Sequence, residues 1–300
     1  MSRNASVTRE VGADMTVELG RIGIWRRRDQ LTPRLAKEVE ALGYGTVWIG
    51  GSPPADLFLA QELLDATSRL AVATGIVNMW SAPATEVAAS HHRIAAAHPG
   101  RFLLGVGIGH PEATQEYRSP YDTIVDYLDV LDAEGVPVED RVLAALGPKV
   151  LALAAERTAG AHPYLTTPEH TRRAREILGE GPLLAPEQKV VLDTDPVAAR
   201  ALGRPAVDRP YLHLRNYTSN LTRLGWTDAD LADGGSDALI DALVVHGDAA
   251  TVAAGIRAHL DAGADHVCLQ LLTPPGADPL PGLRALARAL DHPDELDLDD

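Results

Sequence analysis

The chain has 300 residues, of which 45% are hydrophobic, so it can bury a sizeable core and is not expected to be disordered. Its formal net charge of −15 argues against a nucleic-acid partner, because phosphate backbones are bound by basic surfaces. One cysteine excludes a disulfide within the chain, and no apolar run approaches membrane-spanning length, so a cytoplasmic protein without a membrane partner is expected.

The two ends of the chain differ in composition from the rest. Residues 1–18 contain no apolar segment like that of a signal peptide and are expected to form a flexible leader. Residues 291–300, "DHPDELDLDD", are expected to form a solvated acidic tail. Residues 19–290 are therefore predicted to form a single domain.

Within this domain, short apolar runs alternate with amphipathic segments. The first helix has clear boundary signals, with Thr32 as N-cap, Pro33 at the first helical position and Gly43 near the end. Residues 196–263 are mostly helical and too long for one crossover helix, which predicts an insertion over one rim of the sheet. Strands are predicted, in chain order, over 19–25, 46–51, 70–80, 101–110, 141–147, 161–167, 188–194 and 265–273.

Strict alternation of strands and helices predicts a parallel sheet. Eight such units in a chain of this length fit an α/β fold, a closed (β/α)8 TIM barrel with a helical insertion between strands 7 and 8. An open doubly wound sheet is the alternative, because loop lengths and crossover handedness do not separate the two. In a barrel, the functional site lies at the carboxyl ends of the strands.

Glycines gather at the carboxyl ends of the second to fifth strands, and Gly75 interrupts the third strand. A glycine inside a strand indicates a bulge or the close approach of another group to the backbone. Glycine also lets a flat ring or a phosphate approach the chain. These positions predict a cofactor site, and the alternative for Gly75 is relief of crowding against a neighbouring helix.

Several common enzyme motifs are missing. No predicted strand end carries the paired carboxylates of a glycosidase, and the chain has neither a Gly-x-Ser-x-Gly elbow nor a His-Glu-x-x-His helix. His91 and His92 are adjacent on a predicted helix, so their rings diverge and no metal site is expected. "GVGIGHPE" is a weak dinucleotide fingerprint, because His110 stands where the third glycine belongs.

Four segments, "VATGIVNMW", "HPGRFLLGVGIGHPE", "LAALGPK" and "LDAGADHVCLQL", follow one another in an order that resembles the luciferase-like monooxygenase superfamily. More narrowly, they are similar to its actinobacterial branch that uses the deazaflavin coenzyme F420. The resemblance covers residues 19–290 and implies a homodimeric oxidoreductase that transfers a hydride between the deazaflavin C5 and a small organic substrate. An FMN-dependent monooxygenase and a low-turnover deazaflavin-binding protein are the alternatives.

The resemblance also implies roles for particular residues. It places a bulge with a non-proline cis peptide bond at Gly75–Ile76, against the central ring of the cofactor. A second implication concerns the end of strand two, where many F420-dependent relatives carry an acidic residue and a histidine. Gly51 and Ser52 stand there in this chain, so the sugar-phosphate dehydrogenase reaction is not expected. The residues implied to contact the cofactor are Ser52, Gly75, Ile76, Asn78, Gly107, Ile108, Gly109, His110, Leu146, Gly147, Pro148, Gly160 and His162.

Two residues are candidates for catalysis. His110 has a side chain whose ordinary pKa suits proton transfer near neutral pH, although it can equally cap the segment that follows it. Asn78 can hydrogen-bond the ring or a substrate carbonyl. His162 can instead brace the phosphate loop, and Tyr211 and Tyr217 in the insertion can cover the pocket or pack on the rim.

Overall fold

The computed structural model describes residues 17–109 and 119–291. Its strands form a parallel sheet in which β4 pairs with β5 and the others follow the order β10-β9-β11-β1-β2-β3-β5-β6-β7-β8. The strands are β1 (Ile22–Arg27), β2 (Thr46–Gly50), β3 (Ala71–Thr74), β4 (Val77–Asn78), β5 (Phe102–Gly107), β6 (Arg141–Leu143), β7 (Gly160–Ala161), β8 (Leu183–Leu184), β9 (Glu187–Val191), β10 (Val244–His246) and β11 (Val267–Leu271).

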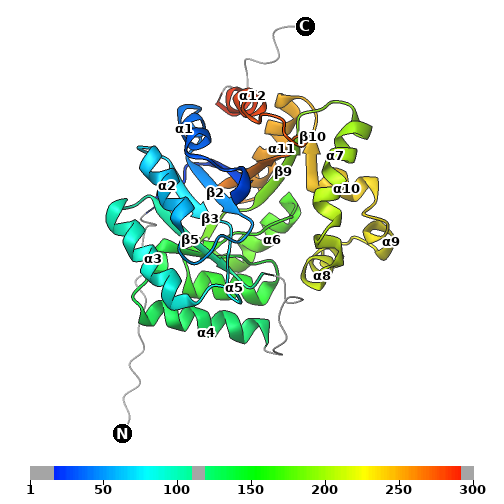
Figure 1. Ribbon diagram of the computed structural model, residues 1–300. Helices are drawn as coiled ribbons and strands as arrows, with labels where there is room; N and C mark the ends of the chain where they lie inside the picture. Colours follow the sequence, from blue (N-terminus) through cyan, green and yellow to red (C-terminus); the bar gives the residue numbers. More distant parts are fainter. Residues whose placement is uncertain (1–16, 110–118, 292–300) are drawn as a thin grey trace.

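Helices surround this sheet (Figure 1). Several begin with a proline at the first helical position, as α1 does after the N-cap Thr32, whose Oγ1 accepts the Leu35 N–H. The helices that follow barrel strands are α1 (Pro33–Ala41), α2 (Phe58–Ala66), α3 (Ala84–Ala97), α4 (Pro120–Ala133), α5 (Pro148–Arg157), α6 (Pro168–Leu178), α11 (Ala249–Asp261) and α12 (Leu280–Asp291). No helix in the described part of the chain is long and apolar enough to cross a membrane.

The sheet closes on itself through residues 183–191, which contain both β8 and β9. On one edge, the Leu183 N–H donates to Ala159 O at 2.7 Å, as part of the pairing of β8 with β7. On the other edge, β9 pairs with β11. Since β3 with β4, and β8 with β9, each form one interrupted strand, eight strands complete the barrel. The predicted TIM barrel is confirmed, and the open sheet is excluded.

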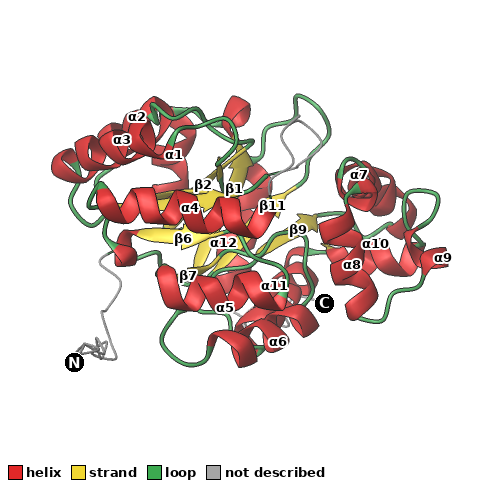
Figure 2. Cartoon of the chain, turned by 90° about the horizontal axis from the view of Figure 1, so that it is seen from below, coloured by secondary structure: helices red, strands yellow, loops and turns green. Residues whose placement is uncertain are grey.

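The expected helical insertion lies between β9 and β11. It contains α7 (Pro196–Asp208), the short 3-10 helix η4 (Tyr211–His213), α8 (Arg215–Arg223), α9 (Asp228–Leu231) and α10 (Asp237–Leu243). These helices stand beside the barrel (Figures 1 and 2) and pack around a hydrophobic core of their own, which includes Leu212, Leu239 and Leu243.

The insertion returns to the barrel through β10, which pairs with the upper part of β9. Before β10 begins to pair, the same edge of this strand bonds to β7 and the residues that follow it. The last of these hydrogen bonds runs from the Glu187 N–H to Pro163 O, at 2.9 Å. Above it, Val244 pairs with Lys189. The sixth and seventh barrel strands therefore separate at the mouth, and the insertion is attached where they part.

Candidate functional site

The predicted bulge in the third strand is present. Ala73 pairs with Leu103, whereas Val77 pairs with Val106, so three residues on this strand face two on β5. At the bulge, Thr74 Oγ1 accepts the Gly105 N–H at 2.8 Å and donates to Gly105 O at 2.7 Å. A side chain thus replaces the backbone pairing that the extra residue interrupts.

The implied cis peptide bond is wrong. The cis bond among the described residues is Arg209–Pro210, and Gly75–Ile76 is trans. Because the register offset by itself produces the bulge, the strand interruption does not require a cis bond.

The glycines near the bulge make room for side chains of this protein. A Cβ added at Gly75 would lie 3.0 Å from Trp25 Nε1, and one added at Gly107 would lie 2.6 Å from Ile76 Cγ2. A Cβ added at Gly50 would meet the Trp25 ring at 2.1 Å. Internal packing therefore accounts for these glycines, which by themselves do not mark a ligand site.

His162 lies inside the barrel. Its ring stacks on Trp48, with centroids 4.3 Å apart, and its Nδ1–H donates to Ala185 O at 2.7 Å. Nε2 is buried without a hydrogen-bond partner among the described residues, and it lies 3.7 Å from the position that a Cβ of Gly75 would take. Burial lowers the pKa of His162 to about 4, so the ring is neutral at pH 7.

The implied phosphate segment around Gly160 lies on β7. Gly160 begins β7, and a Cβ added there would lie 2.0 Å from Leu183 O, so this glycine is part of the barrel wall. His162 belongs to the barrel interior, as described above. Neither residue lies in a helix, and their implied contacts with the cofactor stay predictions.

The other implied phosphate segment is at the mouth, where Gly147 is the N-cap of α5 and Pro148 is its first residue. Leu146 O accepts a hydrogen bond from His170 Nε2 at 2.9 Å, which ties this loop to α6. Arg223 of α8 brings its Nη2 atom to 3.7 Å from the position that a Cβ of Gly147 would take. The Arg173 guanidinium in turn donates to Arg223 O at 2.8 Å.

This arrangement fits an anionic group. A helix N-terminus carries partial positive charge and free N–H groups, and the exposed Arg223 adds a full charge beside it. No motif around Gly147 could have identified Arg223, because it comes from an insertion helix far along the chain. The bulge and this terminus lie on the strands that flank β5, since β4 and β6 both pair with it. Together they fit a flat ring that carries a phosphate.

An ion pair that the sequence analysis missed is buried on β9. Lys189 Nζ lies 3.1 Å from Glu187 Oε1, and each side chain is 1% exposed. Glu187 Oε2 also accepts the Leu165 N–H at 3.1 Å. Burial raises the pKa of Glu187 and lowers that of Lys189, while each partner opposes the shift of the other. The signal was available, because Lys189 is a charged residue inside a predicted barrel strand.

Aromatic side chains cover this ion pair. Lys189 Nζ lies 3.9 Å from the centroid of the Tyr164 ring, and the Tyr164 hydroxyl donates to Gln270 Oε1 at 2.9 Å. The rings of Tyr164 and Tyr211 are 5.2 Å apart, and those of Tyr211 and Tyr217 are 4.8 Å apart. The insertion therefore packs aromatic rings onto the barrel rim.

The remaining candidates lie around the third and fourth strand ends. Asn78 Oδ1 accepts the Trp80 N–H at 2.9 Å, and a Cβ added at Gly109 would collide with the Asn78 amide. Ser52 follows β2 in a left-handed conformation, with φ of 48°, and Ile108 packs against the core outside the barrel. His110 lies outside the described residues.

Comparisons with known proteins agree with this architecture. No curated protein matches the sequence. One similar solved structure is an F420-dependent secondary alcohol dehydrogenase in complex with an F420–acetone adduct, with 18% identity, a TM-score of 0.67, and 89% of this chain and 97% of that chain covered. Another is the coenzyme F420-dependent tetrahydromethanopterin reductase from Methanopyrus kandleri, with 18% identity, a TM-score of 0.63 and the same coverage.

A third similar structure contains FMN. It is the oxygenating constituent of 3,6-diketocamphane monooxygenase from Pseudomonas putida, with 14% identity, a TM-score of 0.66, and 90% of this chain and 96% of that chain covered. Identities this low establish a shared fold and leave the cofactor open. A sequence model of luciferase-like monooxygenases matches residues 28–266. Because this match spans most of the barrel, the chain belongs to the luciferase-like monooxygenase family, a family of oxidoreductases.

Proposed function

We propose that this protein is an F420-dependent oxidoreductase that transfers a hydride between the deazaflavin C5 and a small organic substrate. The observation that carries the proposal is that the Gly75–Ile76 bulge and the N-terminus of α5 belong to the strand ends on either side of β5, since β4 and β6 both pair with β5. Two of the three similar structures described above are F420-dependent proteins, and this is our reason for proposing F420 rather than FMN.

The residues present suggest a division of tasks. The N-terminus of α5 and Arg223 would hold the phosphate, while Ile76 at the bulge would contact the ring. Asn78 Oδ1 is already engaged by the Trp80 N–H, so its Nδ2 is the atom that would donate to the ring or to a substrate carbonyl. His110 is the proposed proton donor or acceptor.

The chemistry itself belongs to the cofactor. A bound deazaflavin supplies a carbon that accepts or donates a hydride, and the protein contributes binding, orientation and exclusion of competing reactions. The substrate would approach the mouth of the barrel, which Tyr211 and Tyr217 border from the side of the insertion.

The first test is a fluorescence titration with F420 and, separately, with FMN. We expect F420 to bind more tightly, and Arg223→Gln to weaken its binding about tenfold, or ~1.4 kcal/mol, because the anion loses a charged partner. Arg69→Gln is the matched control, since Arg69 is also exposed but precedes β3 at the opposite end of the barrel. Preference for FMN would instead indicate an oxygen-dependent monooxygenase, and binding of neither would contradict a redox function.

A second test separates an enzyme from a carrier. The protein with bound F420 is incubated with oxidisable alcohols, and with bound reduced F420 it is incubated with carbonyls, imines and activated alkenes. We expect one class to change the deazaflavin absorbance over many turnovers. Tight binding with no turnover in any class would indicate a deazaflavin-binding protein.

A further inference from the structure

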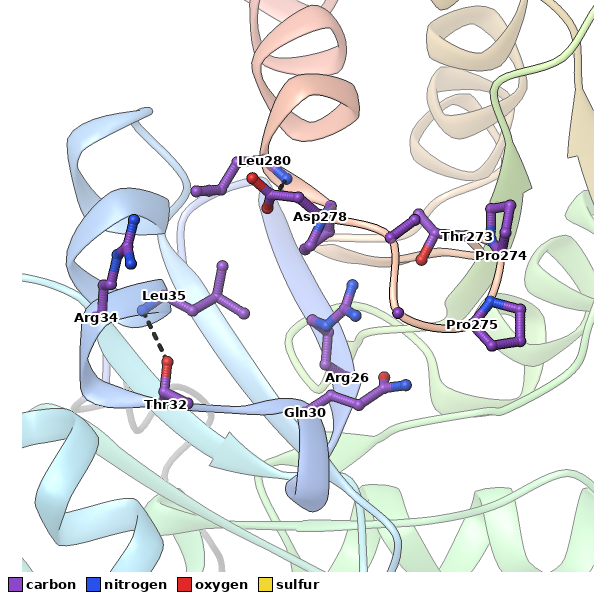
Figure 3. A pocket seen from close by; sticks show the side chains of 13 residues that line it. Arg26, Gln30, Thr32, Arg34, Leu35, Thr273, Pro274, Pro275, Asp278 and Leu280 are labelled. Carbon is purple, nitrogen blue, oxygen red and sulfur yellow. Dashed lines mark hydrogen bonds between the residues drawn. The ribbon is translucent and has the colours of Figure 1, made fainter.

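A cavity of about 410 Å³ lies on the outer side of the barrel wall, between the segment that follows β1 and the loop that joins β11 to α12. Figure 3 shows its lining side chains. The lining residues are Arg26, Gln30, Thr32, Arg34, Leu35, Thr273, Pro274, Pro275, Gly276, Ala277, Asp278, Pro279 and Leu280. This volume is within the range of small-molecule sites.

Arg26 gives the cavity its chemical character. Side chains alternate along β1, so Trp25 packs in the barrel interior while Arg26 points outward into the cavity (Figure 3). Arg26 is only 7% exposed, and its Nε atom is buried with no hydrogen-bond partner among the described residues. A buried guanidinium stays protonated, so leaving it unpaired is costly, and an anion in the cavity would offset that cost.

No carboxylate of residues 17–109 or 119–291 forms an ion pair with Arg26. Asp278 is the charged residue whose attraction acts on Arg26, but the structure places no ion pair between them, and Asp278 Oδ1 accepts the Leu280 N–H at 3.0 Å. Arg34, which is exposed, adds a second positive charge to the lining. Two guanidinium groups and one carboxylate leave a local charge of +1, which one monoanion would balance.

The rest of the lining defines the body of the ligand. Three prolines, Pro274, Pro275 and Pro279, line the cavity together with Leu35 and Leu280. Rigid apolar walls of this kind favour a compact apolar group over an extended polar chain. Gln30 and Thr273 line the same cavity as Arg26, and their side chains carry hydrogen-bond donors (Figure 3).

We propose that this cavity binds a small organic acid, with its carboxylate on Arg26 and its apolar body between the proline-lined loop and Leu35. The site is separate from the proposed cofactor site, because Arg26 and Trp25 lie on opposite faces of β1. A dianionic phosphate is disfavoured, since it would overbalance the local charge and meet the Asp278 carboxylate.

Calorimetric titration of the full-length protein with benzoate tests the proposal. We expect one site with a Kd on the order of 1 mM, typical of a ligand of about ten heavy atoms, and at least tenfold weaker binding of the neutral benzyl alcohol. Inorganic phosphate should bind more weakly than benzoate. Absence of saturable benzoate binding, or tighter binding of phosphate, would overturn the proposal.

Two variants assign the binding to this cavity. Arg26→Gln should weaken benzoate binding at least tenfold, whereas the exposed Arg69→Gln should leave it unchanged. Asp278→Asn should strengthen binding several-fold, because it removes a repelling charge while its side-chain oxygen still accepts the Leu280 N–H. A folded Arg26→Gln variant that binds benzoate as tightly as the natural sequence would contradict the site. If Arg26→Gln fails to fold, Asp278→Asn decides, and unchanged or weaker benzoate binding by that variant would contradict the site.

Discussion

Buried histidines are the most unusual individual residues of the barrel. His162 and His266 both contact Trp48: the His162 ring stacks on it, and its Nε1–H donates to His266 Nε2 at 3.0 Å. His259 is held between Thr171 Oγ1 and Gln188 Oε1, each at 2.7 Å. The neutral form of each ring therefore suits its surroundings. A second ring N–H would either face a group that is already a donor or be buried without an acceptor.

These histidines predict an acid-sensitive fold. Burial lowers the pKa of His162, His259 and His266 to about 4, below the value near 6.5 in the unfolded chain. The unfolded state then binds more protons between these values, so stability is full above pH 6.5 and falls as the pH drops toward 4. Each histidine contributes at most about 1.4 kcal/mol per pH unit.

Urea unfolding at pH 7.5, 6.0 and 5.0 measures this loss. The variant His259→Gln should show a shallower decline than the natural sequence, because it removes one of the three titrating rings. A free energy of unfolding that stays constant between pH 7.5 and 5.0 would show that these rings titrate normally in the folded protein.

At the level of elements, the bulge between β3 and β4 depends on one hydroxyl. Thr74 Oγ1 satisfies both the N–H and the C=O of Gly105, a position where a Cβ would collide with Thr74 O. Strand three can therefore contain an extra residue without leaving buried backbone groups unpaired. This interruption brings Ile76 and Asn78 to the end of the strand.

Thr74→Val should weaken the bulge strongly. It keeps the shape of the side chain but leaves two buried backbone groups of Gly105 without partners, at a cost of about 2–4 kcal/mol in the free energy of unfolding. Thr74→Ser is the matched control, since it keeps the hydroxyl and loses one methyl group. Chemical denaturation of both variants provides the comparison, and a valine variant as stable as the serine variant would disprove the role of the hydroxyl.

On the scale of the whole molecule, charge is distributed unevenly. The chain carries a net charge of −15, yet Arg223 and Arg173 meet beside the N-terminus of α5. Screening limits the reach of distant charges to about 10 Å at 0.1 M salt, so a bound anion responds mainly to its neighbours. The homodimer that the family resemblance implies stays a prediction, which sedimentation velocity can test.

Salt dependence distinguishes local from net charge. If F420 binds as proposed, its affinity should fall as ionic strength rises from 0.05 to 0.5 M, with the steepest change in the natural sequence and a shallower one in Arg223→Gln. Titrations at three salt concentrations measure the slope. An affinity that increases with salt would mean that the overall negative charge dominates and that the arginines do not contact the anion.

Local signals in the chain predicted much of this structure. Alternating apolar runs and capping residues such as Thr32 and Pro33 indicated the order of strands and helices, and Gly75 indicated the bulge. The local signals did not show how Gly160 and His162 pack. The barrel places Gly160 against Leu183 in its wall and the His162 ring against Trp48 in its interior.

The sequence by itself determined the fold class, because the periodicity of apolar residues is local and eight strand–helix units of this length fit a closed barrel. Tertiary structure decided which distant side chains meet: Arg223 with the start of α5, Lys189 with Tyr164, and Arg26 with the loop before α12. The physical reason is that these contacts arise only when the barrel closes and the insertion docks on its rim, and no local pattern records the separation of residues in space.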